Sequence, residues 1–287
     1  MSMTRRMIVL FALLTLAAVP VFASHSWGGY HWARTSNPFT LKTGDNVNST
    51  WDPYLAGAVS DWSQSTVLDM SIVAGGANPK NCRPTSGRIE VCNSTYGNNG
   101  WLGIAQIWIT GGVHITQATT KLNDTYFNTA TYNTPPWRRL VACQEVAHDF
   151  GLDHQDETFD NANLGSCMDY TNDPDGGAGG ASSNDPSNEH PNSHDFQQIQ
   201  TIYQHLDSTT TISVLQDSLN AMATKLSQPT TVAGDDLDAP WRWGTPAGWD
   251  SEGTPRVFVL NTGGGERVIT HVFWAMDTPQ GQQRFDE

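Results

Sequence analysis

The sequence predicts an α+β fold, in which helices and strands occupy largely separate parts of the chain. Three observations lead to this class. An amphipathic helix and several β-type runs fill the first half, two helical segments follow, and two further β-type runs close the chain around the turn Gly263-Gly264-Gly265. The 287 residues show no internal repeat. They are enough for one substantial domain and a smaller C-terminal appendage.

The first 23 residues are typical of a signal peptide. Two arginines precede an apolar run over residues 7–19, and Val21-Phe22-Ala23 offers small residues at the cleavage positions. The run is shorter than the roughly 20 apolar residues of a membrane-spanning helix, although an uncleaved N-terminal anchor is the alternative. We therefore expect a secreted protein that begins near Ser24 and has no membrane attachment once the signal is removed.

The composition limits the class of partner. The formal net charge is −14 at pH 7, whereas binding to nucleic acid or to anionic lipid requires a basic face. We therefore expect no nucleic-acid or membrane partner, and a monomer.

The helical elements follow from apolar spacing. Leu55, Ala58, Val59 and Trp62 recur at helical intervals and predict a helix over residues 51–65. The later segments expected to be helical are 137–150, which follows two prolines and stops before a glycine, and 194–206, which carries an apolar stripe.

The strands are expected where β-type residues cluster between turns. Residues 78–100 are turn-rich and are expected to form a disulfide-stapled excursion, while residues 153–192 are loop-like. A helical or linker segment is expected over 208–240, and a small β-rich appendage over 241–287. The expected strands are 67–73, 104–109, 113–116, 256–260 and 267–274.

One helical segment carries the residues of a metal site. Gln144 and His148 are four positions apart and therefore project from one face of the helix, with Glu145 beside them. Gly151 suits a sharp turn, which would return His154 towards the same point. Three ligands and a base around one open position are what a catalytic zinc ion requires.

This segment, Gln144-Glu145-Val146-Ala147-His148-Asp149-Phe150-Gly151-Leu152-Asp153-His154, resembles the metzincin signature His-Glu-x-x-His-x-x-Gly-x-x-His at every fixed position except the first. Ser166-Cys167-Met168-Asp169-Tyr170 resembles the Met-turn of that family in its astacin and serralysin form. The resemblance covers about residues 30–207.

The resemblance implies a catalytic domain over residues 24–207, with a twisted mixed sheet, an active-site helix and a smaller C-terminal subdomain closed by a helix. It implies a secreted zinc endopeptidase acting on peptide or protein substrates. Gln144, His148 and His154 would bind Zn²⁺ and Glu145 would be the general base. Met168 would form the floor of the site, and Tyr170 would steady the tetrahedral intermediate. Residues 111–116 are the candidate for the edge strand that holds the substrate.

The four cysteines allow three connectivities, and an exported chain favours disulfides. Cys82 and Cys92 form a local pair. If the Met-turn packs beneath the active-site helix, as the resemblance implies, Cys143 and Cys167 come within disulfide range. The alternative for this second pair is two separate buried thiols.

The substitution at Gln144 leaves three readings open. Its side-chain oxygen is a weaker zinc donor than imidazole but extends a similar length from the helix, so Gln144 could still ligate. A histidine from elsewhere, His114, His190 or His194, could replace it, or the site could be degenerate. Four further histidines have no supporting pattern and are expected to be ordinary surface or core residues: His25, His31, His205 and His271.

Two other functions compete with the peptidase. The first is a catalytically silent metzincin-like scaffold that binds peptide or protein. The second is a carbohydrate-binding protein that uses Trp241, Trp243 and Trp249 of the C-terminal region. The acidic residues between Asp153 and Asp160 could also hold Ca²⁺ through carboxylate oxygens, but without an EF-hand spacing a solvated loop is the preferred reading.

Overall fold

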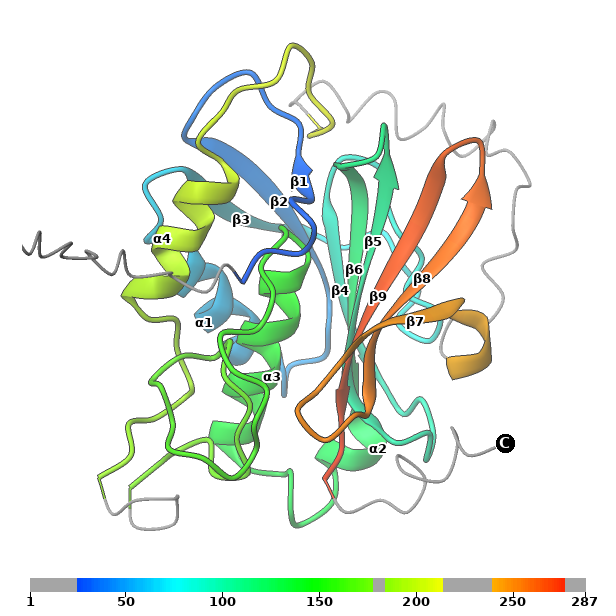
Figure 1. Cartoon of the computed structure of the whole chain (residues 1–287). Coiled ribbons are helices and arrows are strands. Elements are labelled where there is room, and N and C mark those ends of the chain that lie inside the picture. The colour runs from blue at the N-terminus through cyan, green and yellow to red at the C-terminus, as the bar shows by residue number, and fades with distance from the viewer. Residues whose placement is uncertain (1–24, 178–183, 214–238, 277–287) are drawn as a thin grey trace, which may run out of the picture.

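The computed structural model describes residues 25–177, 184–213 and 239–276 (Figure 1). The predicted signal peptide and most of the predicted linker therefore lie outside the described residues. No helix within the described ranges is long and apolar enough to cross a membrane.

The described chain is built on one mixed sheet of nine strands. Its order is β3-β2-β4-β6-β5-β9-β8-β7, and β1 pairs with the start of β6. Strands β2, β3, β4 and β6 run parallel, whereas β5 is antiparallel to both of its neighbours and β7, β8 and β9 form an antiparallel meander. The strands are β1 (His31–Trp32), β2 (Phe39–Asn46), β3 (Leu68–Ala74), β4 (Ile89–Ser94), β5 (Trp101–Thr110), β6 (His114–Asn123), β7 (Thr245–Trp249), β8 (Pro255–Gly263) and β9 (Glu266–Trp274).

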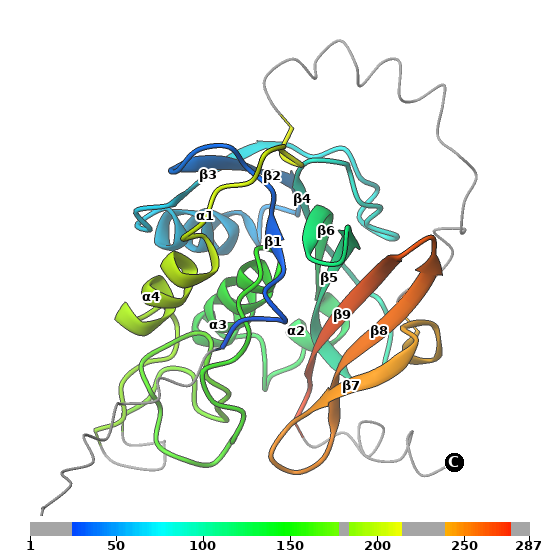
Figure 2. The same ribbon diagram turned by 45° about the horizontal axis from the view of Figure 1, so that its top comes forward.

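The three longer helices lie together on one side of this sheet, as Figures 1 and 2 show. Helix α3 contacts β5, β6 and β9, and α1 packs between α3 and β3. The helices are α1 (Asp52–Trp62), α2 (Asp124–Phe127), α3 (Pro135–His148) and α4 (Ser193–Ile202), with a 3₁₀ turn η1 (Pro240–Arg242) before β7.

The alternation of side chains along β9 divides them between two cores. Ile269 and Phe273 belong to the main core, which also contains the buried face of α3. Val272 and Trp274 belong to a second apolar cluster that contains Trp243 of the C-terminal region. Because strand side chains alternate with period two, His271 points to the same side as Ile269 and Phe273, towards α3.

The end of α3 is set by Gly151. Its φ is +100°, and a Cβ at this position would lie 2.1 Å from the carbonyl oxygen of Tyr30. Only glycine adopts this backbone without strain and allows so close an approach. The turn that the sequence predicted at Gly151 is therefore present, and it sends the chain back towards the helix.

All three predicted helices and the five predicted strands are present, with shifted ends. The sequence did not predict strands β1, β2, β4 and β7 or the short helix α2. Strand β4 lies inside the stretch that was expected to be a turn-rich excursion. It was missed because its six residues are flanked by glycine, proline and asparagine, which are typical of turns.

Two expectations about the sheet are wrong. Residues 111–116 do not form an edge strand, because β6 begins at His114 and lies between β4 and β5. The C-terminal region is not a separate appendage either, since β9 pairs along β5 and extends the main sheet. The sequence hid this arrangement because strand partners far apart in the chain leave no local signal.

Candidate metal centre

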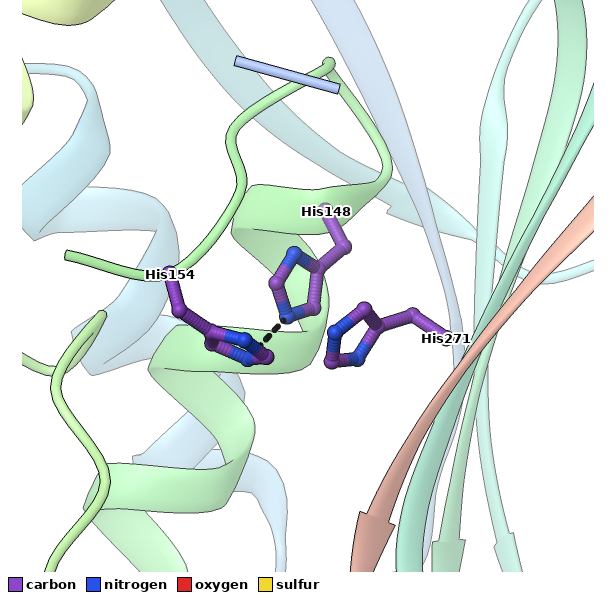
Figure 3. Close-up of side chains that lie close together, drawn as sticks. All are labelled: His148, His154 and His271. Atoms are coloured by element: carbon purple, nitrogen blue, oxygen red, sulfur yellow. Dashed lines mark hydrogen bonds between the residues drawn. The ribbon is translucent and has the colours of Figure 1, made fainter. Parts of the chain in front are cut away.

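Three histidines from separate elements converge beside the end of α3 (Figure 3). His148 is the last residue of α3, His154 lies in the loop that follows, and His271 lies in β9. One ring nitrogen from each lies within 4.8 Å of the other two, and all three side chains are buried. The sequence predicted that His148 and His154 would meet, and it missed His271.

The hydrogen bonds of His148 and His154 direct one nitrogen of each ring at the same point. The Nδ1 atom of His148 donates to the carbonyl oxygen of Leu152 at 2.7 Å, so the Nε2 atom of the neutral ring carries a lone pair. The Nδ1 atom of His154 lies 3.0 Å from Oε1 of Glu157. The two Nε2 atoms face each other at 3.1 Å, a spacing that one bridging cation or one shared proton would satisfy.

His271 completes this group. Its ring stacks on His148 with centroids 3.8 Å apart, and its centroid lies 4.2 Å from that of His154. Within the described part of the chain, neither of its buried ring nitrogens has a hydrogen-bond partner. A buried imidazole whose two nitrogens lack hydrogen bonds is costly unless a bound group satisfies them, which makes His271 a candidate metal ligand.

Burial keeps the three imidazoles neutral. It is the largest cause lowering the pKa of His148 to about 3, and it also holds the pKa values of His154 and His271 well below the usual range for histidine. Arg256 adds a smaller effect on the last two, because its positive charge opposes protonation. Neutral imidazole is the form that binds a metal ion.

Glu145 lies on α3, three residues before His148, and it is fully buried. Neither carboxylate oxygen has a hydrogen-bond partner among the described residues. Burial, and after it the charge of Asp149, raises the pKa of Glu145 well above its ordinary value. A charged carboxylate without a partner in the core loses the hydration free energy that water would give it. A nearby metal ion and its water would offset this loss.

The space for Glu145 is made by a glycine on the facing strand. A Cβ at Gly103 of β5 would lie 2.7 Å from Cγ of Glu145 and 2.8 Å from Cγ1 of Val141. Two positions further along β5, Ala105 pairs with His271 of β9. Small residues on β5 therefore leave room between the sheet and α3 for the carboxylate and the imidazole.

Gln144 is also fully buried, one turn before His148 on α3. Its Nε2 atom donates to the carbonyl oxygen of Cys167 at 2.8 Å, while its Oε1 atom has no hydrogen-bond partner within the described residues. The amide therefore ties α3 to the segment of the predicted Met-turn. Ligation by Gln144 stays a prediction.

The predicted Met-turn lies close to the histidines. Met168 is fully buried in the main core, and its carbonyl oxygen accepts a hydrogen bond from the backbone of Gln155. The ring of Tyr170 lies 4.1 Å from that of His154. Cys143 is bonded to Cys167, and Cys82 to Cys92, as the sequence reading paired them. The roles assigned to Met168 and Tyr170 stay predictions.

The three histidines proposed as replacements for Gln144 lie elsewhere. His190 is on the surface, where its Nδ1 atom lies 2.7 Å from Asp61. His194 stacks on His25, and His114 lies beside Asp207. The replacement histidine that the structure places in the group is His271, which only the pairing of β9 with β5 brings there.

A pocket of about 430 Å³ reaches His154 from the surface. The loop after α3 forms one wall, and the segment joining β7 to β8 forms the other, including Trp249. Its acidic residues are Asp153, Asp156, Glu157 and Asp250. The group of three histidines is therefore closed towards the sheet, and the pocket approaches it from the side of His154.

The donor set fits a zinc ion. Three imidazoles are a common ligand set of catalytic zinc, and a tetrahedral ion with bonds of about 2.0–2.1 Å places its ligand atoms roughly 3.3–3.4 Å apart. The 3.1 Å between the two Nε2 atoms is close to this spacing. The second nitrogens of His148 and His154 meet a carbonyl and a carboxylate, which are the usual outer partners of zinc-bound histidines.

No known protein family matches this sequence, and no characterised protein matches it. Among solved structures, the chain is similar to high choriolytic enzyme 1, a hatching enzyme zinc-protease from Oryzias latipes (Medaka fish). The match has 15% sequence identity and a TM-score of 0.35, and it covers 61% of this chain and 94% of that one. A likeness this weak does not establish a shared fold or activity.

Proposed function

We propose that this protein is a zinc-dependent peptidase in which His148, His154 and His271 hold the metal ion. The proposal rests on one observation above all. Three neutral, buried imidazoles converge, and each has a ring nitrogen available for a metal ion. The carboxylate of Glu145, which has no hydrogen-bond partner among the described residues, lies one helical turn before His148. In this reading His271 of β9 supplies the ligand that Gln144 does not supply from α3.

Glu145 is the general base of the proposed reaction. When bound, a zinc ion would polarise the substrate carbonyl and lower the pKa of a water molecule. The carboxylate of Glu145 would accept a proton from the attacking water and then donate it to the leaving amine. Tyr170, whose buried hydroxyl has no hydrogen-bond partner among the described residues, is positioned beside His154 to donate to the developing oxyanion.

The pocket beside His154 favours substrates with positive charge. Four carboxylates line it, of which Asp250 is already ion-paired with Arg256, and Trp249 forms part of its wall. A lysine or arginine side chain of a substrate would meet the remaining acidic groups and a flat apolar surface. We therefore propose secreted peptides or proteins with a basic residue near the scissile bond as substrates. The two disulfides agree with a role outside the cytoplasm.

Hydrolysis of a casein-like protein and of basic peptides by the purified full-length protein tests the function. Cleavage should require zinc and stop with a chelator. Glu145→Gln should lower the rate by about 10²–10⁴-fold while the protein still binds zinc, because the base is lost and the ligands remain. The matched control is Glu266→Gln, an exposed residue at the start of β9, which should leave the rate unchanged.

The burial of the site residues favours a second possible function, in which the protein binds metal without catalysis. Glu145, His148 and His271 are fully buried between α3 and the sheet, in which β9 pairs alongside β5. A metal ion enclosed in this way could serve stability alone, as in the silent scaffold that the sequence left open. Zinc binding without zinc-dependent cleavage in either the unmodified protein or Glu145→Gln would support this scaffold and contradict the peptidase.

A further inference from the structure

A second group of potential metal ligands lies where the N-terminal segment meets the chain after α4. His31 of β1 is paired in register with His114, the first residue of β6. His205 and Asp207 follow α4 and reach the same place. The imidazoles of His31 and His205 and the carboxylate of Asp207 thus converge, with one ligand atom of each within 4.8 Å of the other two, while His114 lies against Asp207.

The spacing of these groups matches a tetrahedral ion. The Nε2 atoms of His31 and His205 lie 3.1 Å apart. From Oδ1 of Asp207, the distance is 3.2 Å to Nε2 of His114, 3.5 Å to Nε2 of His31 and 3.7 Å to Nε2 of His205. The ligand atoms around a zinc ion lie roughly 3.3–3.4 Å apart, so these distances scatter around that value.

The outer contacts hold two of these groups in the ligand orientation. The Nδ1 atom of His31 donates to the carbonyl oxygen of Gly29 at 2.8 Å, which leaves the lone pair of the neutral ring on Nε2. The other oxygen of Asp207, Oδ2, accepts from the backbone and the guanidinium of Arg34 at 3.2 and 3.0 Å. Oδ1 therefore stays directed at the imidazoles, as in metal sites whose ligands are oriented by a second layer of hydrogen bonds.

Two side chains at this group are partly exposed, so a metal ion could reach it from solvent. The side chains of His205 and His114 are 47% and 29% exposed, whereas those of His31 and Asp207 are 5% and 9% exposed. The ion would have three protein ligands and one position open to water, and no carboxylate free to act as a base is part of the group.

We propose that His31, His205 and Asp207 form a second zinc site, which fastens the N-terminal segment to the chain after α4, with His114 holding the carboxylate of Asp207 from the other side. It is independent of the peptidase, because none of its ligands belongs to the group around His148. The competing arrangement is a metal-free one, in which a protonated histidine pairs with Asp207.

Counting bound zinc in the full chain tests the site. After removal of metal and dialysis against micromolar zinc, the unmodified protein should bind two equivalents. His205→Ala and Asp207→Asn should each bind one equivalent fewer and lose the gain in thermal stability that the second equivalent gives. His190→Ala, which changes an exposed histidine paired with Asp61, should bind both.

His154→Ala separates this proposal from the proposed function. It should lose the metal ion beside α3 and keep the one at Asp207, so that a cobalt-substituted sample still shows the absorption of a tetrahedral site. If His205→Ala and Asp207→Asn keep the full zinc content of the unmodified protein, the site does not exist. If either variant fails to fold, chemical modification of His205 in the unmodified protein tests the site instead. Zinc-dependent protection of His205 from chemical modification supports the site, and equal modification with and without zinc contradicts it.

Discussion

The imidazole rings of His148 and His271 stack with their centroids 3.8 Å apart and their planes inclined by 28°. One residue ends the central helix, and the other lies in the strand that extends the sheet beyond β5. This contact joins the C-terminal region to the proposed active site. If the strand and the helix each contribute a ligand, as proposed, the metal ion should stabilise the packing of β9 against α3.

Replacement of His271 tests this link. His271→Ala should weaken zinc binding beside α3 by at least tenfold, because it removes one of three protein ligands. Zinc affinity can be measured by competition with a chelating dye, with His190→Ala as the control. An affinity equal to that of the control would show that His271 is not a ligand.

Gly103 should be required for the carboxylate facing it. A methyl group there would lie under 3 Å from atoms of Glu145 and Val141, so Gly103→Ala should destabilise the protein by about 1–3 kcal/mol. Gly57→Ala is the matched control, since Gly57 lies in α1 with nothing within 4 Å of the added Cβ and should stabilise by up to about 1 kcal/mol. Urea unfolding measures both. Equal stability of the two variants would contradict this packing.

The Cys143–Cys167 bond should matter for the metal as well as for stability. It closes a separation of 24 residues, and its loss through serine replacement should cost about 3 kcal/mol. Zinc affinity should also fall, because Gln144 and His148 follow Cys143 on α3. Replacement of the Cys82–Cys92 pair should lower stability without lowering zinc affinity beside α3. An equal loss of affinity in both variants would count against a specific role for the first bond.

Asp195 should give the protein a pH-dependent stability. Burial raises its pKa to about 6, although hydrogen bonds from Ser166 and the backbone of Asn192 oppose the shift. The nearest titratable groups facing it are His25, at 3.7 Å, and the adjacent His194.

Between pH 4 and 6 the folded state holds a proton on Asp195 that the unfolded state has released. Stability should therefore fall by about 3 kcal/mol as pH rises through this window. Denaturant titrations at a series of pH values measure the slope. Asp195→Asn should flatten it, and an unchanged slope in that variant would assign the effect to other groups.

The local part of the site could be predicted from the sequence. His148 and His154 are brought together by one helix and one glycine turn, and the geometry of both follows from short spacings. Gly151 has the positive φ that the turn requires. The pairing of Cys143 with Cys167 was predicted on the condition that the two motifs adjoining these cysteines pack together, as the metzincin resemblance implies.

The third histidine could not be predicted in the same way. His271 faces α3 only because β9 pairs with β5 in a register that sets it opposite Ala105, and a shift of one residue would turn it to the other side. The pairing of distant strands depends on the whole sheet. The same reason explains why the sequence predicted an appendage over residues 241–287. It also explains why the group around Asp207 was not predicted, because His31 and Asp207 lie far apart in the chain.

The most direct measurement of the central claim is anomalous X-ray diffraction at the zinc edge from crystals of the full-length protein grown with zinc. The account predicts a peak beside α3 that lies about 2.0–2.1 Å from one nitrogen each of His148, His154 and His271. The absence of a peak there, or a peak bound by Gln144 with His271 turned away, would contradict it.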